Sequence, residues 1–303
     1  MPSKLAPQAL ARVLASLDAF RNGPALYALI ISFCFAGLLL AMAESSLARG
    51  DSVWGATWGV VGVTVAFVGV NATGLLLMDQ ALARPVRDVV DALFDALQLV
   101  HRVLLSLALV LAAAAVVVGL ILALLWAARL RWVGAPLFAL AVPVGVLLLG
   151  VMALACVVLV GPLTGPSVWT GHGALTTVGM LWRQLRHRLP EAALLMTAVL
   201  ALTGAVTAVT SFVVLSGGRA LALLAVWGVG VDVPAQQLTA GLFGYGLRSL
   251  GAAGAPVAAT PLGVAALVGG GVVFVVALVL PTLVYLRGCC AVYLALQADD
   301  RGY

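Results

Sequence analysis

Long, uninterrupted hydrophobic stretches dominate the pattern of residues along the chain, and short polar segments separate them. A helix needs about 20 apolar residues to cross the roughly 30 Å of hydrocarbon in a bilayer. Six stretches meet this requirement, and none carries Asp, Glu, Lys, Arg or His in its interior. The pattern predicts an all-α integral membrane protein with six transmembrane helices, at 24–43, 53–78, 103–128, 133–162, 192–216 and 261–286.

The polar segments carry lysine and arginine unevenly. The two chain ends and the connections after the second and fourth crossings hold eleven of these residues, and the opposite connections hold five. Because basic residues concentrate in cytoplasmic connections, both ends are predicted to lie in the cytoplasm (N-in, C-in). Arginine greatly outnumbers lysine, a bias typical of GC-rich bacterial genomes, so we expect a multi-pass protein of the bacterial cytoplasmic (inner) membrane.

Three amphipathic segments outside the crossings are predicted to be helices at the cytoplasmic membrane surface: 1–23, 79–102 and 174–189. In each, apolar residues recur at intervals of three and four opposite charged or polar ones. A basic amphipathic helix with a boundary tryptophan, as in the third segment, is typical of the membrane interface. The predicted organisation is thus an interfacial helix (1–23), a six-helix transmembrane domain (24–286) and a cytoplasmic tail (287–303).

The connection 217–260 is long, nearly uncharged and predicted to lie on the outer side. Its apolar part, 219–231, would extend only about 20 Å as a helix and is too short to cross the membrane. We therefore expect this part to be either re-entrant or interfacial, and the sequence leaves both alternatives open.

Composition supports the membrane prediction and narrows the partners. Hydrophobic residues make up 64% of the chain and charged residues only 9%, far below the roughly 25% of a soluble domain. The net charge of +5 comes from arginines scattered between apolar runs. This distribution indicates topology signals and contact with anionic membrane lipids, and it does not favour nucleic acid as a partner.

The residues that usually carry catalysis are not arranged for it. The sequence contains no GxSxG, HExxH, Walker A or dinucleotide-binding motif. The three histidines lie outside the predicted crossings, and the four cysteines form no CxxC pattern. We therefore predict that the chain is not an enzyme and has no catalytic, cofactor-binding or metal site. Ion-driven pumps usually place ionisable residues inside the membrane, so that class is also disfavoured.

Mild polar residues do enter two predicted crossings in a regular pattern. They share one face on each helix, and this pattern has two interpretations. In the first, the side chains form hydrogen bonds within the bundle, either to the carbonyl four residues earlier in the same helix or to a neighbouring helix. In the second, they line a weakly polar path. The second crossing also has a GxxxG spacing at Gly55–Gly59, which predicts close helix packing. The candidate path-lining residues are Thr57, Thr64, Asn71, Thr203, Thr207 and Thr210.

Two charged surfaces are candidate contact sites. The acidic residues Asp88, Asp91 and Asp95 of the 79–102 segment either dock a cytoplasmic partner or form a solvated face. Their predicted i,i+4 ion pairs are Arg84–Asp88 and Arg87–Asp91. On the 174–189 segment, the basic residues either bind lipid phosphates or serve only as topology signals. These basic residues are Arg183, Arg186 and Arg188.

The region from Val160 to Leu195 carries a local resemblance. Gly161-Pro162 ends a crossing, a stretch of small residues follows, and Ala174-Leu175, Trp182-Arg183, Arg186 and Leu189 lead into the next crossing. This pattern resembles YciC-like bacterial membrane proteins and the membrane domain fused to some glycerophosphodiesterases. The resemblance covers about an eighth of the chain. It implies an all-helical membrane module without catalytic residues.

The arrangement of the predicted helices has a second, architectural resemblance. An interfacial N-terminal helix, six crossings and a cytoplasmic helix between the second and third resemble exporter-class ABC permeases, although the 163–191 connection is longer and no ATP-binding motif is present. The leading functional prediction is a non-catalytic subunit of a multi-protein transport or export assembly, with other membrane or cytoplasmic subunits and a separate ATPase as partners. The alternative is a structural or lipid-interacting scaffold without a translocation path.

Overall fold

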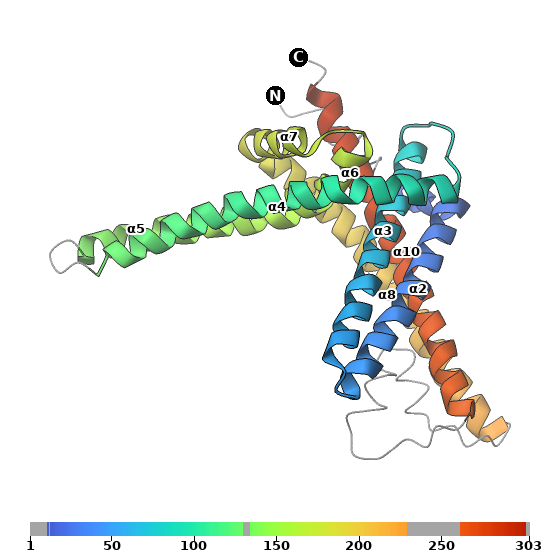
Figure 1. Cartoon of the computed structure of the whole chain (residues 1–303). Helices are drawn as coiled ribbons and strands as arrows, with labels where there is room; N and C mark the ends of the chain where they lie inside the picture. Colours follow the sequence, from blue (N-terminus) through green and yellow to red (C-terminus); the bar gives the residue numbers. More distant parts are fainter. Residues whose placement is uncertain (1–10, 12, 130–133, 229–260, 301–303) are drawn as a thin grey trace. The chain divides into compact units, whose positions relative to one another are not determined.

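The structure, a computed structural model, describes residues 11, 13–129, 134–228 and 261–300. Within these ranges every regular element is a helix and no strand occurs, which confirms the all-α prediction (Figure 1). The elements are η1 (Ala15–Arg21), α2 (Gly23–Ala48), α3 (Ser52–Ala81), α4 (Val89–Ala127), α5 (Gly134–Ala155), the π-helical turn η2 (Cys156–Val160), α6 (Gly161–Trp169), α7 (Ala174–His187), α8 (Leu189–Gly228) and α10 (Pro261–Asp300).

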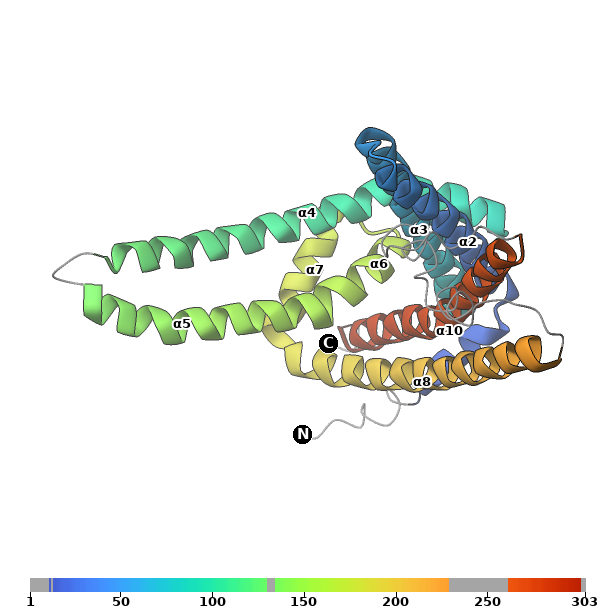
Figure 2. The same cartoon turned by 90° about the horizontal axis from the view of Figure 1, so that it is seen from below.

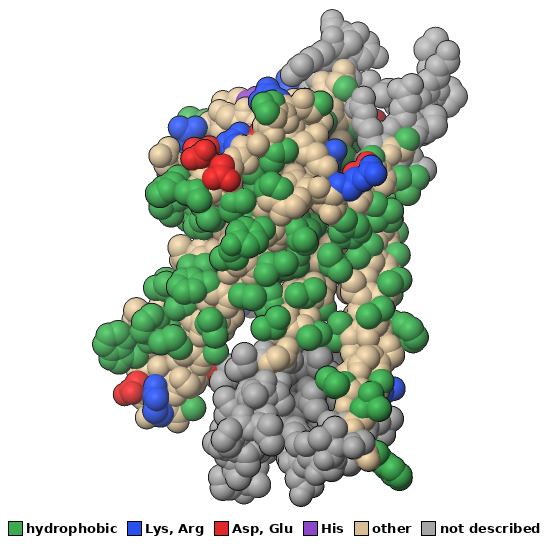
Figure 3. Space-filling view, turned by 90° about the vertical axis from the view of Figure 1, so that its right-hand side faces the viewer, with side chains coloured by type: hydrophobic (Ala, Val, Ile, Leu, Met, Phe, Trp, Pro, Cys, Tyr) green, Lys and Arg blue, Asp and Glu red, His purple; other side chains and the backbone are tan. Residues whose placement is uncertain are grey.

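Six helical segments of the described chain are long and apolar enough to span a membrane, as predicted. Hydrophobic side chains also cover much of the face shown in Figure 3, as expected for a protein surrounded by hydrocarbon. The chain is therefore an all-α, multi-pass membrane protein. The six segments are Gly23–Ala48, Ser52–Ala81, Val89–Ala127, Leu137–Trp169, Leu189–Leu221 and Gly271–Ala298.

The chain divides into two compact units. Of the described residues, one unit contains 11, 13, 97–198 and 288–300, and the other contains 14–96, 199–228 and 261–287. Three of the long helices, α4, α8 and α10, contribute a part to each unit. We call the first unit the α7 unit and the second the α2–α3 unit, because each of these helices lies wholly within the unit named after it.

Small residues bring α2 and α3 close together in the α2–α3 unit (Figure 1). A Cβ atom added at Gly55 would lie 2.5 Å from the Cγ of Leu47, and one at Gly69 would overlap Ser32. Gly62, midway between them, has similarly little room. Residues seven apart lie on one face of a helix, so these glycines form a continuous contact stripe. Of the predicted Gly55–Gly59 pair, Gly55 is closely packed, whereas a Cβ at Gly59 would lie at an ordinary 3.9 Å from Ala43; the close contact continues through Gly62 and Gly69 instead.

Asn22 ties the N-terminal segment to this hairpin. Its side chain accepts a hydrogen bond from the Ala25 amide (3.1 Å) and so caps α2, as is usual for asparagine at a helix N-terminus. Its amide also donates to the Leu76 carbonyl of α3 (3.2 Å). Of the predicted 1–23 helix, the structure describes the 3-10 turn η1 and a few residues before it. Residues 1–10 and 12 lie outside the described residues.

The predicted 79–102 helix is interrupted in the structure, which corrects its boundaries. α3 continues to Ala81, residues 82–88 form a non-helical connection, and α4 runs unbroken from Val89 through the third crossing. Pro85 explains the interruption, because proline lacks an amide hydrogen and restricts the residue before it to extended conformations. No glycine or proline lies between residues 89 and 118 to stop α4. The surface segment and the third crossing therefore form one helix.

A left-handed turn ends α3. Ala83 has a φ of 52°, a conformation that costs a non-glycine residue about 1–2 kcal/mol. The Arg84 amide donates to the Asp79 carbonyl (2.9 Å) and the Ala83 amide to the Gln80 carbonyl (3.2 Å). This pair of bonds is a Schellman motif, which satisfies carbonyls at the end of the helix. The motif turns the chain immediately before Pro85.

In the α7 unit, α4 and α5 form a hairpin (Figures 1 and 2). A Cβ added at Gly145 of α5 would lie 3.6 Å from the side chain of Ile121 on α4. The predicted 133–162 crossing extends further than expected, because η2 and α6 continue the helical path to Trp169. Residues 130–133 lie outside the described residues.

The boundaries near the predicted outer connection also differ. α8 continues to Gly228, so residues 217–228 are helical and the connection starts later than predicted. Most of the apolar part predicted to be a separate re-entrant or interfacial segment, 219–231, is therefore the end of α8, whereas residues 229–260 lie outside the described residues. α10 has 40 residues and extends about 60 Å at 1.5 Å per residue. It includes the whole predicted 261–286 crossing and most of the predicted tail.

Candidate functional site

Helix α7, predicted as part of the 174–189 surface segment, presents three different faces. Ala174, Leu181 and Gln184 are buried against the protein. Leu175 and Trp182 are apolar but 77% and 63% exposed. Basic side chains occupy the remaining arc, between the exposed apolar face and the buried face. They are Arg183, Arg186 and His187.

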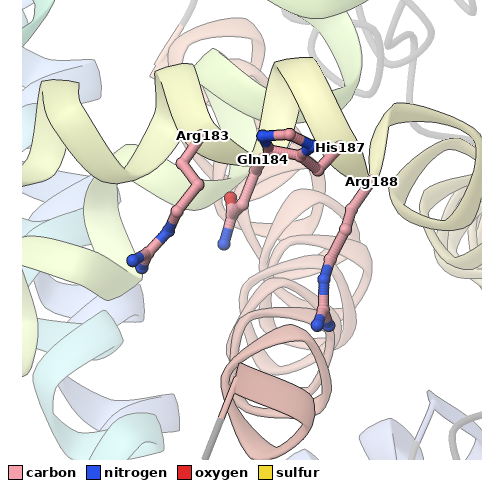
Figure 4. A pocket seen from close by; sticks show the side chains of 4 residues that line it. All are labelled: Arg183, Gln184, His187 and Arg188. Carbon is pink, nitrogen blue, oxygen red and sulfur yellow. The ribbon is translucent and has the colours of Figure 1, made fainter. Parts of the chain in front are cut away.

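A pocket of about 250 Å³ lies at the junction of α7 and α8, and it is lined by Arg183, Gln184, His187 and Arg188. Figure 4 shows Arg183, Gln184 and Arg188 extending to the same side of α7, with nitrogen atoms at their far ends. Of the three predicted lipid-binding arginines, the structure therefore brings Arg183 and Arg188 together in a pocket. Arg186 is exposed and does not line it.

Gln184 is the unusual member of this pocket. Gln184 is only 3% exposed, and its Oε1 atom has no hydrogen-bond partner in the described part of the chain. Buried polar side chains are nearly always hydrogen-bonded. A buried glutamine with an unsatisfied oxygen therefore needs an explanation. The sequence analysis did not single out Gln184, because the residue pattern of the 174–189 segment does not show that this amide is buried or that its oxygen lacks a partner.

Arg188 links the pocket to the end of α10. Its Nη1 atom donates to the Leu296 carbonyl (3.2 Å), and a positive charge at a helix C-terminus is favourable. Nearby, the Gln297 amide contacts the sulfur of Met180 on α7 (3.7 Å). These contacts hold the last turns of α10 against α7.

A buried polar network supports the same region. Tyr293 of α10 is fully buried, and its hydroxyl accepts a hydrogen bond from the Gln297 amide (2.6 Å). The hydroxyl also lies 2.9 Å from Thr170 Oγ1, which donates to the Ser167 carbonyl (2.8 Å). The Nδ1 atom of His172 is 2.9 Å from the same threonine oxygen. This network ties the α6–α7 turn to α10, and the sequence held no signal for it because its members are far apart in the chain.

The acidic candidates separate into two groups. Arg87 in the α3–α4 connection makes ion pairs of 2.7 Å with Asp79 and with Asp95. The hydrogen bond with Asp79 raises the pKa of Arg87 above its ordinary value. The predicted Arg84–Asp88 and Arg87–Asp91 pairs are wrong, because residues 82–88 are not helical and the i,i+4 geometry is missing. Asp95 is therefore held by Arg87.

Asp88 and Asp91 are exposed, and no ion pair is found for either among the described residues. Both lie at the start of α4, where negative charge is favourable. They remain the accessible part of the predicted docking surface.

Most of the polar residues inside the crossings bond to their own helix. Thr57, Thr64 and Thr207 donate to the carbonyls four residues earlier at 2.8 Å, and Asn71 and Thr210 do the same at 2.8 and 2.9 Å. Thr203 differs, because its Oγ1 atom is buried without a partner in the described part of the chain. The first interpretation of the pattern, bonding within the helix, thus describes five of the six residues.

Groups of three or more His, Cys, Asp or Glu residues that could hold a metal ion do not occur among the described residues. The four cysteines, all within the described residues, form no disulfide; Cys289 and Cys290 are buried, Cys34 is half-buried and Cys156 is exposed.

Comparison with known proteins finds no family model, curated protein or solved structure that matches this chain. The resemblances to YciC-like proteins and to ABC permeases therefore stay predictions. Function has to be argued from the residues alone.

Proposed function

We propose that this chain is a non-catalytic, multi-pass membrane protein that binds anionic lipids along α7 in the bacterial inner membrane. The observation that supports this proposal is the exposed apolar row of α7, Leu175 and Trp182, in a helix that carries three basic residues in its second half. Exposing such a row to water is unfavourable, whereas the boundary between head groups and acyl chains suits it.

The arrangement around α7 matches the order of layers at a membrane surface. At about 100° per residue, Arg186 projects next to the Leu175–Trp182 row, on the side away from the buried face. With the row in the acyl region, the Arg186 guanidinium would reach lipid phosphates, worth about 1 kcal/mol per basic residue at an anionic surface. Tryptophan at such a boundary is typical of the interface.

Lipid retention tests this proposal. We expect that Arg186→Gln lowers the amount of phosphatidylglycerol that stays with the purified chain by about fivefold, the equivalent of about 1 kcal/mol. Arg49→Gln, an exposed arginine just after α2, is the matched control and should leave retention unchanged. Native mass spectrometry of the protein released from mixed nanodiscs measures bound lipid. Equal retention in Arg186→Gln and wild type would contradict the proposal.

A second proposal is that the chain is a subunit of a transport or export assembly. The observation that favours it is the pair of exposed carboxylates, Asp88 and Asp91, which differ from Asp79 and Asp95 in having no arginine partner among the described residues. Exposed charges without internal partners suit electrostatic contact with another protein. In this function a separate ATPase supplies the energy, and Thr203, whose hydroxyl has no hydrogen-bond partner among the residues described, is the best candidate to border a path.

Charge reversal tests the second proposal. Asp88→Lys with Asp91→Lys should remove a partner ATPase from complexes purified in mild detergent, whereas Asp51→Lys, another exposed carboxylate next to a helix start, should retain it. Thr203→Val with Thr207→Val should then impair transport without loss of folding. If the wild type and the charge-reversed variant both purify without an ATPase, the result favours the lipid-binding proposal.

A further inference from the structure

We propose that the start of α4 is a docking surface for a hydrophobic groove, rimmed by lysine or arginine, on a cytoplasmic partner protein. The inference rests on the second proposed function, in which another subunit contacts this end of the helix, and it names the chemistry of that subunit's surface. The docking surface, which we call the α4 surface, combines an apolar row with the aspartates beside it: Val90, Phe94 and Leu97, and Asp88, Asp91 and Asp95.

The first argument is the exposure of the apolar row. Val90, Phe94 and Leu97 are 55%, 64% and 59% exposed. At about 100° per residue they lie within about 60° of one another, and their spacing of i, i+4 and i+7 is that of the anchors that a helix places in a groove. On the opposite face, Ala92 and Ala96 are fully buried. The row therefore faces away from the packed side of the helix.

The second argument is the length of α4, which is unbroken from Val89 to Ala127 (Figure 1). Tryptophan is typical of a membrane boundary, so Trp126 marks the far end of this crossing. Counted back from there, a helix tilted by about 20° crosses the roughly 30 Å of hydrocarbon in about 21 residues and the head groups in about five more. The membrane therefore ends near residue 100. The apolar row lies beyond it in water, where lipid does not cover it.

The third argument is charge. The charged residues between positions 88 and 100 are three aspartates. Asp91 and Asp95 project about 60–100° from Phe94 around the helix, and Asp88 lies at the helix start. The cytoplasmic membrane surface is negative and repels such a segment, whereas it attracts the basic residues of α7. Lysine or arginine beside an apolar groove of another protein complements both parts of the α4 surface.

The fourth argument is that the α4 surface is preorganised. Arg87 makes ion pairs of 2.7 Å with Asp79 of α3 and with Asp95 of α4, and these pairs tie the start of α4 to the end of α3. A surface held in one arrangement loses little conformational entropy on binding. Asp95 thus belongs to the support, and the exposed Asp88 and Asp91 contact the partner's basic residues.

Site-specific photo-crosslinking tests the inference. Phe94→p-benzoylphenylalanine is made in the full chain, in the membranes of the cells that naturally produce it, and mass spectrometry identifies the crosslinked segment. We expect a protein adduct whose contact segment contains apolar residues next to lysine or arginine. Tyr27→p-benzoylphenylalanine, at an exposed aromatic residue of α2, is the control and should yield lipid adducts.

Charge reversal assigns the contact to complementary charges. Asp88→Lys with Asp91→Lys should lower the yield of the protein adduct at least about fivefold, whereas Asp51→Lys should change it less than about twofold. Replacement of the basic residues in the identified contact segment by glutamate should then restore the yield with the charge-reversed chain.

Co-purification of the identified partner tests the apolar row. Phe94→Ala should lower the recovery of the partner at least about tenfold, because aromatic anchors dominate the energy of most interfaces. Leu175→Ala, at another exposed apolar residue on α7, should leave the recovery unchanged. Circular dichroism verifies that both variants fold.

Any of five results would overturn the inference: only lipid adducts or none at residue 94, an adduct within the chain or to a second copy, a contact segment without lysine or arginine, an undiminished yield after charge reversal, or unchanged recovery with Phe94→Ala. The second proposed function fails separately, when no ATPase co-purifies. An ATPase that co-purifies while residue 94 reacts only with lipid retains that function and refutes the inference. A basic groove on a protein other than an ATPase does the reverse.

Discussion

The α2–α3 hairpin and the α4–α5 hairpin are both apolar, yet their side chains face different surroundings. Leu75, Leu76 and Leu77 of α3 are at most 2% exposed. On α4, by contrast, Leu111 is 70% exposed and Leu120 is 66% exposed. Glycines seven residues apart let α2 and α3 approach each other, and α4 has no such series. Apolar composition therefore predicts a crossing, whereas the spacing of small residues indicates where two crossings meet.

This difference implies different sources of stability. In lipid, hydrocarbon covers apolar side chains as well as protein does, so helices associate through close packing and hydrogen bonds. The α2–α3 hairpin has both. The exposed side chains of the α4–α5 hairpin depend on lipid, or on another protein, for cover. The next five predictions concern the stability of these regions, and each is measured by SDS-induced unfolding in mixed micelles, followed by circular dichroism.

The largest effect is expected for a buried leucine. Leu76→Ala should lower the free energy of unfolding by about 2–5 kcal/mol, because it leaves a cavity among packed side chains. Leu120→Ala, the same change at an exposed site on α4, should cost less than about 0.5 kcal/mol. Equal losses would show that Leu120 is packed against protein in the folded chain and would contradict the contrast between the two hairpins.

The second-largest loss in the free energy of unfolding is expected when the arginine in the α3–α4 connection is removed. Arg87→Gln leaves the buried Asp79 carboxylate without its ion pair, and we expect a loss of about 2–3 kcal/mol, below the cost for a fully buried pair because Arg87 is partly exposed. Arg84→Gln is the control, since no ion pair is found for Arg84 among the described residues.

The pH dependence of this loss is also predicted. The pKa of Arg87 is raised in the folded protein, so its stabilising effect is complete below the pKa of an unfolded arginine and disappears only as pH rises through the folded value. The difference between wild type and Arg87→Gln should thus stay constant from neutral to mildly alkaline pH. A decline of this difference over that interval would contradict the assignment of the ion pair to Arg87.

A smaller loss is expected in the glycine stripe. Gly69→Ala places a Cβ against Ser32, so α2 and α3 must separate, at a cost of about 1–3 kcal/mol. Gly59→Ala puts its Cβ at an ordinary 3.9 Å from Ala43 and should be neutral or slightly stabilising. Adding Ser32→Gly to Gly69→Ala should restore part of the loss. A failure of this rescue would indicate that the stripe does not set the distance between the helices.

The smallest effect is a gain. Ala83→Gly should stabilise the chain by up to about 1 kcal/mol, because glycine adopts the left-handed conformation at this position without strain. Ala81→Gly, two residues earlier within α3, should instead cost about 0.5–1 kcal/mol. A loss of stability in both variants would mean that the turn after α3 is not left-handed.

Much of the helical framework could be predicted from residue patterns. Long apolar runs indicate crossings because hydrocarbon requires them, and all six were found close to their predicted places. The helix at α7 was also predicted from its periodicity. Helix ends were less predictable: Pro85 interrupts the predicted 79–102 helix, whereas α8 continues through Gly217 and Gly218 and α10 through Gly288, because no proline follows their apolar runs within these helices.

The candidate sites were predicted only in part. Arg183 and Arg188 were selected for their charge, but charge does not show that they share a pocket while Arg186 lies outside it. Gln184 and Tyr293 were overlooked because their importance comes from burial and from partners distant in the sequence. Arg87 was predicted to pair with Asp91 but pairs with Asp79 and Asp95. The prediction assumed the i,i+4 spacing of an α-helix, whereas Pro85 keeps this segment non-helical.

The contact between Gly69 and Ser32 also constrains how this chain can vary between relatives. A larger side chain at position 69 is tolerable only where position 32 has become smaller, because the two backbones share one narrow gap. Coupled changes in size should therefore be visible when related sequences are compared, with position 32 losing atoms wherever position 69 gains them. Positions 111 and 120 on α4, where the leucines are mostly exposed, should interchange more freely among apolar residues of different bulk.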